Sequence, residues 1–93
     1  MIDEFCIFRT RSAGVHCGTL VEMNNLAALV KDARRIWQWR GAFTLNELAN
    51  HGGAESSRIS EPVPRILLTE VIEVIPCTME SRKNLENSRW DKA

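Results

Sequence analysis

The chain has 93 residues, of which 44% are hydrophobic and 26% charged, and this length predicts a single domain spanning residues 1–93. Its 12 Lys and Arg side chains balance its 12 Asp and Glu side chains, which argues against bulk electrostatic binding to DNA or to an acidic membrane surface. A domain of this size buries only a modest core, so we expect a partner subunit to add to its stability.

The first elements along the chain are predicted to form a β-hairpin. Residues 5–10 are β-prone and aromatic, and residues 11–14 form a turn in which Gly14 is free to take a positive φ. Residues 15–23 resume a strand pattern, which Gly18 breaks. The two strands are expected to pair across the turn.

The next stretch is ambiguous. A turn signal at residues 24–25 precedes residues 26–33, which fit either one or two helical turns or a strand by propensity alone. The neighbouring hairpin favours a strand.

Residues 34–40, RRIWQWR, bring cationic and aromatic side chains together. In a strand, successive side chains point to opposite faces. One face would carry Arg35, Trp37 and Trp39, and the other Arg34, Ile36, Gln38 and Arg40. Because neither face is cleanly polar, we expect this strand to cover a partner, a ligand or a wet groove.

A short helix is predicted next. Gly41 and Ala42 form a small-residue corner, and Thr44 with Glu47 three positions later matches a capping box. The helix is expected over residues 45–50, and the glycines within residues 51–53 end it. Its inward side chains are predicted to be Leu45, Leu48 and Ala49.

The remaining elements complete an α+β fold. Residues 52–64 are predicted to be a long loop, mobile until something binds, and residues 66–75 one apolar strand at the centre of the sheet. A C-terminal helix is expected over residues 79–88. Its packing side chains are predicted to be Met79, Leu85 and, beyond the helix, Trp90. We therefore expect a small, mainly antiparallel β-sheet with one short central helix and a C-terminal helix.

The segment RRIWQWR suits a nucleotide-like ligand. A tryptophan ring stacks on a base, and a planar guanidinium holds a phosphate by charge-assisted hydrogen bonds. The corner at Ala42 would let a ligand approach the backbone, and the amides that begin the Thr44 helix offer an anion site. The alternative is that Trp37 and Trp39 are core or subunit-interface residues with arginines stacked over them.

The turn at residues 11–14 has related chemistry. Its Arg11 side chain, Ser12 hydroxyl and Gly14 amide can converge on one phosphate. A plain hairpin turn with an exposed arginine explains the same residues.

No catalytic or metal-binding constellation is recognisable. Three cysteines without a CxxC spacing predict reduced thiols in a reducing cytosol and argue against a zinc site. His16 and His51 are far apart and more simply structural, while Glu70 and Glu73 are predicted to fall on opposite faces of one strand. We expect a protein that is not an enzyme and needs no cofactor.

The N-terminus is acidic and is followed by no long apolar run. Neither a signal peptide nor a membrane span is therefore predicted. We expect the protein to stay in the compartment where it is made.

Three motifs together resemble a family of small tailed-phage proteins of unknown function. They are R-x-x-x-A-G-V-x-x-G-x-L at residues 9–20, A-R-R-I-W-x-W-x-G-A-x-[ST]-L-x-x-L-A-x-x-G at residues 33–52 and V-I-E-[VI]-I-P-C-T at residues 71–78. The resemblance covers residues 4–90 and keeps the order of the three blocks. The sequence departs from the pattern at Gln38, where an aromatic residue is common, and at Phe43, where a small residue is.

This resemblance implies a phage protein made during infection and located in the host cytoplasm. Small phage proteins of this kind often counter host defence, and the resemblance extends to the anti-CBASS sponges, which are compact oligomers that sequester cyclic oligonucleotide signals. It therefore implies a homo-oligomer, a dimer or tetramer, that binds a cyclic di- or trinucleotide between subunits. A sponge needs affinity and no catalytic base.

The expected ligand contacts follow from that implied function. Trp37 and Trp39 would stack on bases, and Arg35, with Arg9 or Arg11, would hold phosphates. Hydroxyl and backbone contacts would come from Ser12, Gly14, Ala42 and Thr44, and a closing contact from Arg58.

Two alternatives stay open. The Arg/Trp face could instead grip and inhibit a host defence protein. A single-stranded nucleic-acid binder would use the same stacking chemistry, but the zero net charge weighs against DNA.

Overall fold

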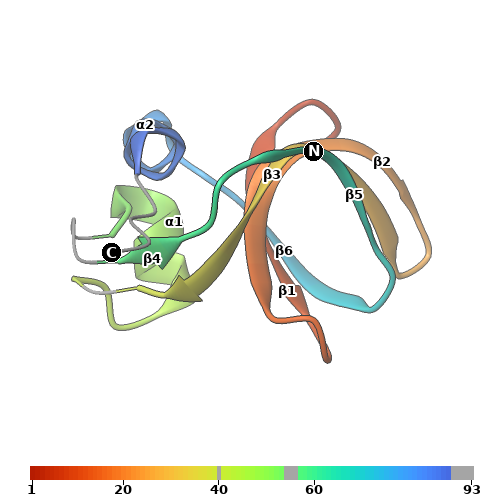
Figure 1. Cartoon of the computed structure of the whole chain (residues 1–93), viewed down its shortest axis with the longest axis horizontal. Helices are drawn as coiled ribbons and strands as arrows, with labels where there is room; N and C mark the ends of the chain where they lie inside the picture. Colours follow the sequence, from red (N-terminus) through yellow and green to blue (C-terminus); the bar gives the residue numbers. More distant parts are fainter. Residues whose placement is uncertain (40, 54–56, 89–93) are drawn as a thin grey trace.

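The computed structural model describes residues 1–39, 41–53 and 57–88, and its fold is α+β as predicted. A six-stranded antiparallel sheet carries one short helix in the middle of the chain and one C-terminal helix (Figure 1). The elements are β1 (Phe5–Thr10), β2 (Val15–Asn24), β3 (Ala27–Gln38), α1 (Leu45–His51), β4 (Arg58–Ile59), β5 (Val63–Leu68), β6 (Val71–Pro76) and α2 (Met79–Asn87).

The predicted hairpin is confirmed, and β3 continues it. Gly14 takes a φ of 83° in the turn between β1 and β2. The ambiguous stretch is a strand, because β3 runs for 12 residues and pairs antiparallel with β2. Gly18 does not break β2. It lies opposite a bulge in β3, where a Cβ would come within 2.5 Å of the Val30 side chain and 2.9 Å of the Lys31 carbonyl.

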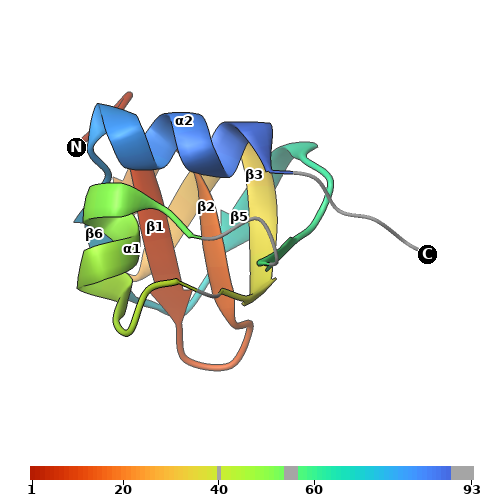
Figure 2. The ribbon, with the colours of Figure 1, turned by 90° about the vertical axis from the view of Figure 1, so that its left-hand side faces the viewer.

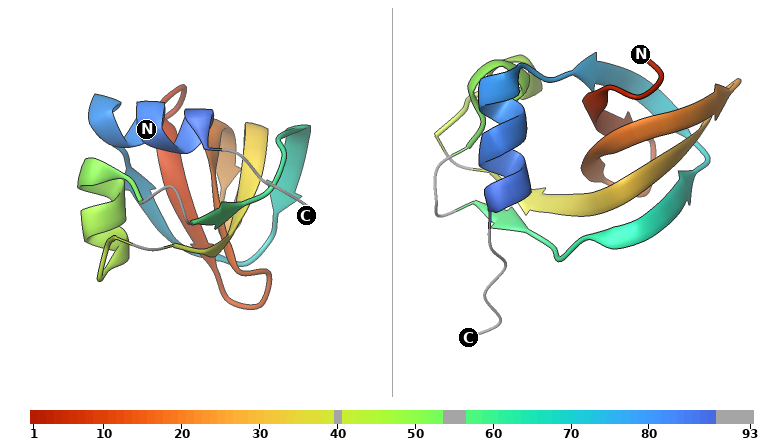
Figure 3. Two further views of the ribbon diagram at one scale, coloured as in Figure 1. Left: turned by 60° about the vertical axis from the view of Figure 1, so that its left-hand side comes forward. Right: turned by 90° about the horizontal axis from the view of Figure 1, so that it is seen from above.

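Residues 66–75 are not one central strand. They are divided between β5 and β6, which a bend at Thr69 and Glu70 separates. The strand order of the sheet is β4-β3-β2-β1-β6, and β5 pairs with β3 beside β4. β6 pairs with β1 at the other end of the order, so β5 and β6 lie near opposite ends of the sheet. The sheet is strongly curled, and the β5–β6 bend carries the chain between its two sides (Figure 3). The apolar composition of this run does not distinguish one straight strand from two strands separated by a bend at a polar pair.

The predicted loop over residues 52–64 is also partly wrong. Residues 54–56 lie outside the described residues, but β4 follows at Arg58–Ile59 and pairs with the end of β3. β5 then begins at Val63.

Both faces of the sheet are buried near β1. One core cluster packs Phe5 and Ile7 against the two helices, and the other packs Cys6 and Phe8 inside the curl of the sheet. Figure 2 shows α1 and α2 together on the first of these faces. Burying a large apolar side chain contributes about 1.5–3 kcal/mol. Because β1 supplies such side chains to both clusters, both cores depend on this strand.

The helix α1 begins at Leu45 as predicted and ends at His51, one residue later than predicted. The Thr44 hydroxyl accepts a hydrogen bond from the Glu47 amide at 3.1 Å, and Gly52 takes a φ of 81° after the last turn. Leu48 and Ala49 are buried and Leu45 packs beside them.

The helix α2 differs from its prediction in one contact. Leu85 is buried as expected, but Met79 is exposed. The buried side chain of the first turn is Ser81, whose hydroxyl donates to the Leu48 carbonyl at 2.7 Å and so joins the two helices. The predicted contacts of Arg40 and Trp90 lie outside the described residues.

Candidate functional site

The strand β3 places its two successive arginines on opposite faces of the sheet. Arg34 and Ile36 are buried on the helix side, whereas Arg35 and Trp37 are exposed on the other side. The indole of Trp37 is 63% exposed. Trp39 does not share this face as predicted, because β3 ends at Gln38 and Trp39 packs against the core cluster beneath the helices.

The short strand β4 brings Arg58 to the same region. Its residues pair with the end of β3, with Gln38 opposite Arg58, and the Ser60 hydroxyl accepts from the Arg35 amide at 2.8 Å. Arg58 is exposed while its neighbour Ile59 is buried. The predicted ligand residues that these pairings bring together are therefore Arg35, Trp37 and Arg58, and Arg58 belongs to a strand and not to a loop that closes.

The β1–β2 turn is occupied by contacts with the β5–β6 bend. The Glu70 carbonyl accepts from the Arg11 amide at 2.9 Å, and the Ser12 hydroxyl donates to the Glu70 carboxylate at 3.3 Å. A carboxylate at this point disfavours phosphate binding, because both groups are negatively charged. The turn that holds Ser12 and Gly14 is thus a braced hairpin, which favours the plain structural explanation of these residues.

Arg9 is likewise engaged elsewhere. Its guanidinium lies 3.5 Å from the carboxylate of Glu73 on β6, and both side chains are about half exposed. The predicted strand that held Glu70 and Glu73 together is broken, since Glu70 lies in the bend and Glu73 in β6.

The start of α1 offers little room for an anion. The Thr44 hydroxyl occupies the Glu47 amide, and the Glu47 carboxylate accepts from the Phe43 amide at 2.9 Å. Ala42 packs against the core cluster that contains Ile36. Phe43, by contrast, has 96% of its side chain exposed, which is unusual for so large an apolar group.

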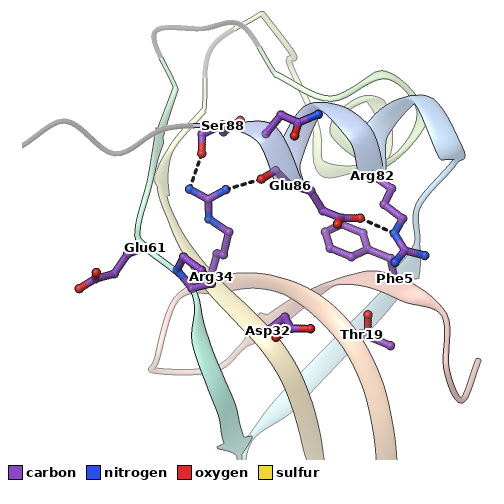
Figure 4. A pocket seen from close by; sticks show the side chains of 10 residues that line it. Phe5, Thr19, Asp32, Arg34, Glu61, Arg82, Glu86 and Ser88 are labelled. Carbon is purple, nitrogen blue, oxygen red and sulfur yellow. Dashed lines mark hydrogen bonds and ion pairs between the residues drawn. The ribbon is translucent and has the colours of Figure 1, made fainter.

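A pocket of about 660 Å³ lies between α2 and the sheet, and sequence reasoning missed it (Figure 4). None of the ten predicted ligand residues lines it. Asp32 on β3 and Thr19 on β2 lie below α2, whose Arg82 and Glu86 form an ion pair at the opposite wall. Its full lining is Phe5, Thr19, Asp32, Arg34, Glu61, Pro62, Arg82, Glu86, Asn87 and Ser88.

The inner wall of this pocket is formed by Arg34. Its side chain is 8% exposed and donates four hydrogen bonds of 2.5–3.0 Å to main-chain carbonyls. Three of these acceptors, Leu85, Glu86 and Ser88, belong to the C-terminal end of α2, and the fourth is Ser60. Arg34 therefore caps α2 and fixes it to β3, a role that satisfies both the orphan carbonyls and the helix dipole.

Asp32 points toward the pocket because of the bulge in β3. Between the pairs Cys17–Arg34 and Thr19–Lys31, β3 contains one residue more than β2, and Asp32 takes a φ of 50°. A bulge re-aims the side chain that it contains. The sequence alternation alone could not reveal this, since it assigns every residue of a strand to one of two faces.

A smaller pocket of about 80 Å³ lies beside Arg35. Among the residues that line it are His16, Ser60 and Glu61. His16 is 1% exposed, and one ring nitrogen lies 2.9 Å from the Ala13 carbonyl, so it braces the β1–β2 turn. Burial lowers the pKa of His16 below its usual value.

The cysteine thiols are free and protonated. Burial raises the pKa of Cys6 to about 11 and that of Cys17 to about 12. Such thiols are poor nucleophiles at neutral pH.

The structure also bears on metal binding and on membrane insertion. Within residues 1–39, 41–53 and 57–88, no group of three or more His, Cys, Asp and Glu side chains is placed to hold a metal ion. Over the same part of the chain, no helix has both the length and the apolar character needed to cross a membrane.

Comparison with known proteins identifies a family without a known activity. No curated protein and no solved structure matches the chain. The family model described as a domain of unknown function, DUF6948, matches residues 3–85. Because this match covers most of the chain, the protein belongs to the DUF6948 family.

Proposed function

We propose that this protein is a non-catalytic phage immune-evasion protein that binds and sequesters a cyclic di- or trinucleotide between copies of itself. The observation that carries the proposal is the 63% exposed indole of Trp37, which stands on β3 near the exposed side chains of Arg35 and Arg58. The phage context and the host cytoplasm come from the resemblance of the three sequence motifs.

The three side chains suit the two halves of a nucleotide. A base stacked on an aromatic ring gains about 1–3 kcal/mol, and any base can stack because each has a π face. A guanidinium is permanently charged and binds phosphate through paired N–H groups. Arg35 and Arg58 lie on neighbouring strands, so two phosphates of one ligand can be reached from a single surface.

The arrangement also favours an oligomer. Trp39 packs on the core, so Trp37 is the tryptophan whose exposed ring can cover a ligand from one side. A base held on both faces then requires the Trp37 of a second copy. The exposed ring of Phe43 adds apolar surface to the region after β3, as is common where protein surfaces meet.

The test is isothermal titration of the wild-type protein with a panel of cyclic di- and trinucleotides. We expect at least one to bind, and both Trp37→Ala and Arg35→Ala to weaken it about 10- to 100-fold, which corresponds to about 1.4–2.8 kcal/mol. Arg65→Ala is the matched control, because Arg65 is an exposed arginine on β5 outside this surface. Absence of heat across the whole panel at high micromolar protein would refute the proposal.

A second candidate function is a protein-interaction module that inhibits a host defence protein. The 96% exposure of Phe43 favours it, because a solitary aromatic ring at a loop makes a strong protein anchor. Native mass spectrometry of protein purified from host cells separates the two candidates: a retained small ligand supports the sponge, and a co-purifying polypeptide lost in Phe43→Ser supports the module.

A further inference from the structure

The pocket between α2 and the sheet carries an inference beyond the proposed function. Its volume of about 660 Å³ lies within the usual range for sites that take small ligands or side chains. Figure 4 shows Thr19 and Asp32 on the strands at one side and Arg82 and Glu86 on α2 at the other.

The charged donors in this pocket are already engaged. Arg34 gives four hydrogen bonds to carbonyls, and Arg82 pairs with Glu86. The acceptors are in excess, because Asp32 and Glu61 have no ion-pair partner among the described residues. A ligand that fits must therefore bring N–H donors and positive charge.

The residues beneath α2 favour a guanidinium over an ammonium as the bound cation. The Phe5 ring already carries one guanidinium, since the Arg82 side chain lies 5.6 Å from its centroid. A planar guanidinium stacks on aromatic and on other guanidinium surfaces, whereas an ammonium is a compact, strongly hydrated charge. The Asp32 carboxylate, aimed into the pocket by the bulge, can accept a guanidinium through both oxygens.

We propose that this pocket binds an arginine side chain presented by a partner polypeptide, with Asp32 as its principal acceptor and Glu61 at the rim. Figure 4 places Glu61 on the far side of Arg34 from Glu86. The pocket lining shares no residue with the Arg35–Trp37–Arg58 surface. The protein thus has one surface for an anion and a separate pocket for a cation.

The experiment follows amide chemical shifts of the full chain during titration with the tripeptide acetyl-Gly-Arg-Gly-amide. We expect millimolar binding, on the order of 4 kcal/mol, with the largest shifts at the residues that line the pocket. The same peptide with citrulline, which is neutral and nearly isosteric, should bind at least 10-fold more weakly. Equal binding of the citrulline peptide, or of a lysine peptide, would overturn the assignment to a guanidinium.

The variant Asp32→Asn tests the acceptor without disturbing the backbone, since Asn also tolerates a positive φ. It should weaken the arginine peptide at least 10-fold. Asp3→Asn is the matched control: Asp3 is an exposed aspartate with a φ of 66° outside the pocket, and its variant should bind within twofold of wild type. Unchanged binding in Asp32→Asn would overturn the proposal. Nucleotide titration of the same variant reports separately on the proposed function.

Discussion

Arg34 is predicted to be the side chain on which the packing of α2 most depends. Replacing it with alanine removes four hydrogen bonds, and the Leu85 carbonyl then keeps only the 3.4 Å bond from the Ser88 amide. A buried acceptor that keeps only so long a bond is poorly satisfied, and this costs about 1–3 kcal/mol. The part-buried carbonyls of Ser60, Glu86 and Ser88 can be reached by water, and each loses about 0.5–1 kcal/mol.

The sum is about 2.5–6 kcal/mol, against about 5–14 kcal/mol for the free energy of unfolding of a domain of this length. Urea denaturation followed by circular dichroism measures the loss, and the melting temperature should fall by about 15–30 °C. Arg34→Lys should lose less, because it retains the charge but not the planar fork.

The neighbouring residue supplies the control. Arg35→Ala removes an exposed arginine from the same strand and should change the free energy of unfolding by no more than about 0.5 kcal/mol. If Arg34→Ala cost less than about 1 kcal/mol, the assignment of Arg34 as the cap of α2 would be refuted.

Two further predictions concern the sheet. Gly18→Ala should lower the free energy of unfolding by about 1–3 kcal/mol in urea denaturation. The added Cβ would lie 2.5 Å from the Val30 side chain, 2.9 Å from the Lys31 carbonyl and 3.2 Å from the Ala33 Cα. A neutral effect would contradict this close approach. Burial lowers the pKa of His16, so its contribution to stability should be present above its unfolded pKa of about 6.5 and be lost as the pH falls toward its folded pKa. His16→Gln should therefore flatten the pH dependence of the free energy of unfolding between pH 7.5 and 5. An unchanged slope would contradict this assignment.

Local signals in the sequence predicted the helices and the first hairpin well. The capping pair Thr44 and Glu47 is confirmed because its contacts span only three residues. Gly14 and Gly52 were recognisable because a positive φ is a local demand on the backbone. The alternation after Ala33 also placed Arg34 and Arg35 on opposite faces correctly.

The candidate site was predicted only in part. The pairing of β4 with β3 brings together Arg35, Trp37 and Arg58, and no local sequence pattern predicts that pairing. Trp39 was assigned to the wrong side because β3 ends one residue before it. Ser12 was assigned to a phosphate, but the β5–β6 bend brings the Glu70 carboxylate to it from 58 residues away in sequence.

The sequence by itself determined the α+β class, the turns, the helix caps and the concentration of arginine and tryptophan in one strand, because each depends on residues close together in the chain. The tertiary structure alone decided that residues 66–75 bend onto two sides of a curled sheet, that Arg34 is consumed by the end of α2, and that a bulge turns Asp32 into a pocket. These features depend on contacts between distant segments, and the amino-acid pattern of either segment is compatible with more than one partner.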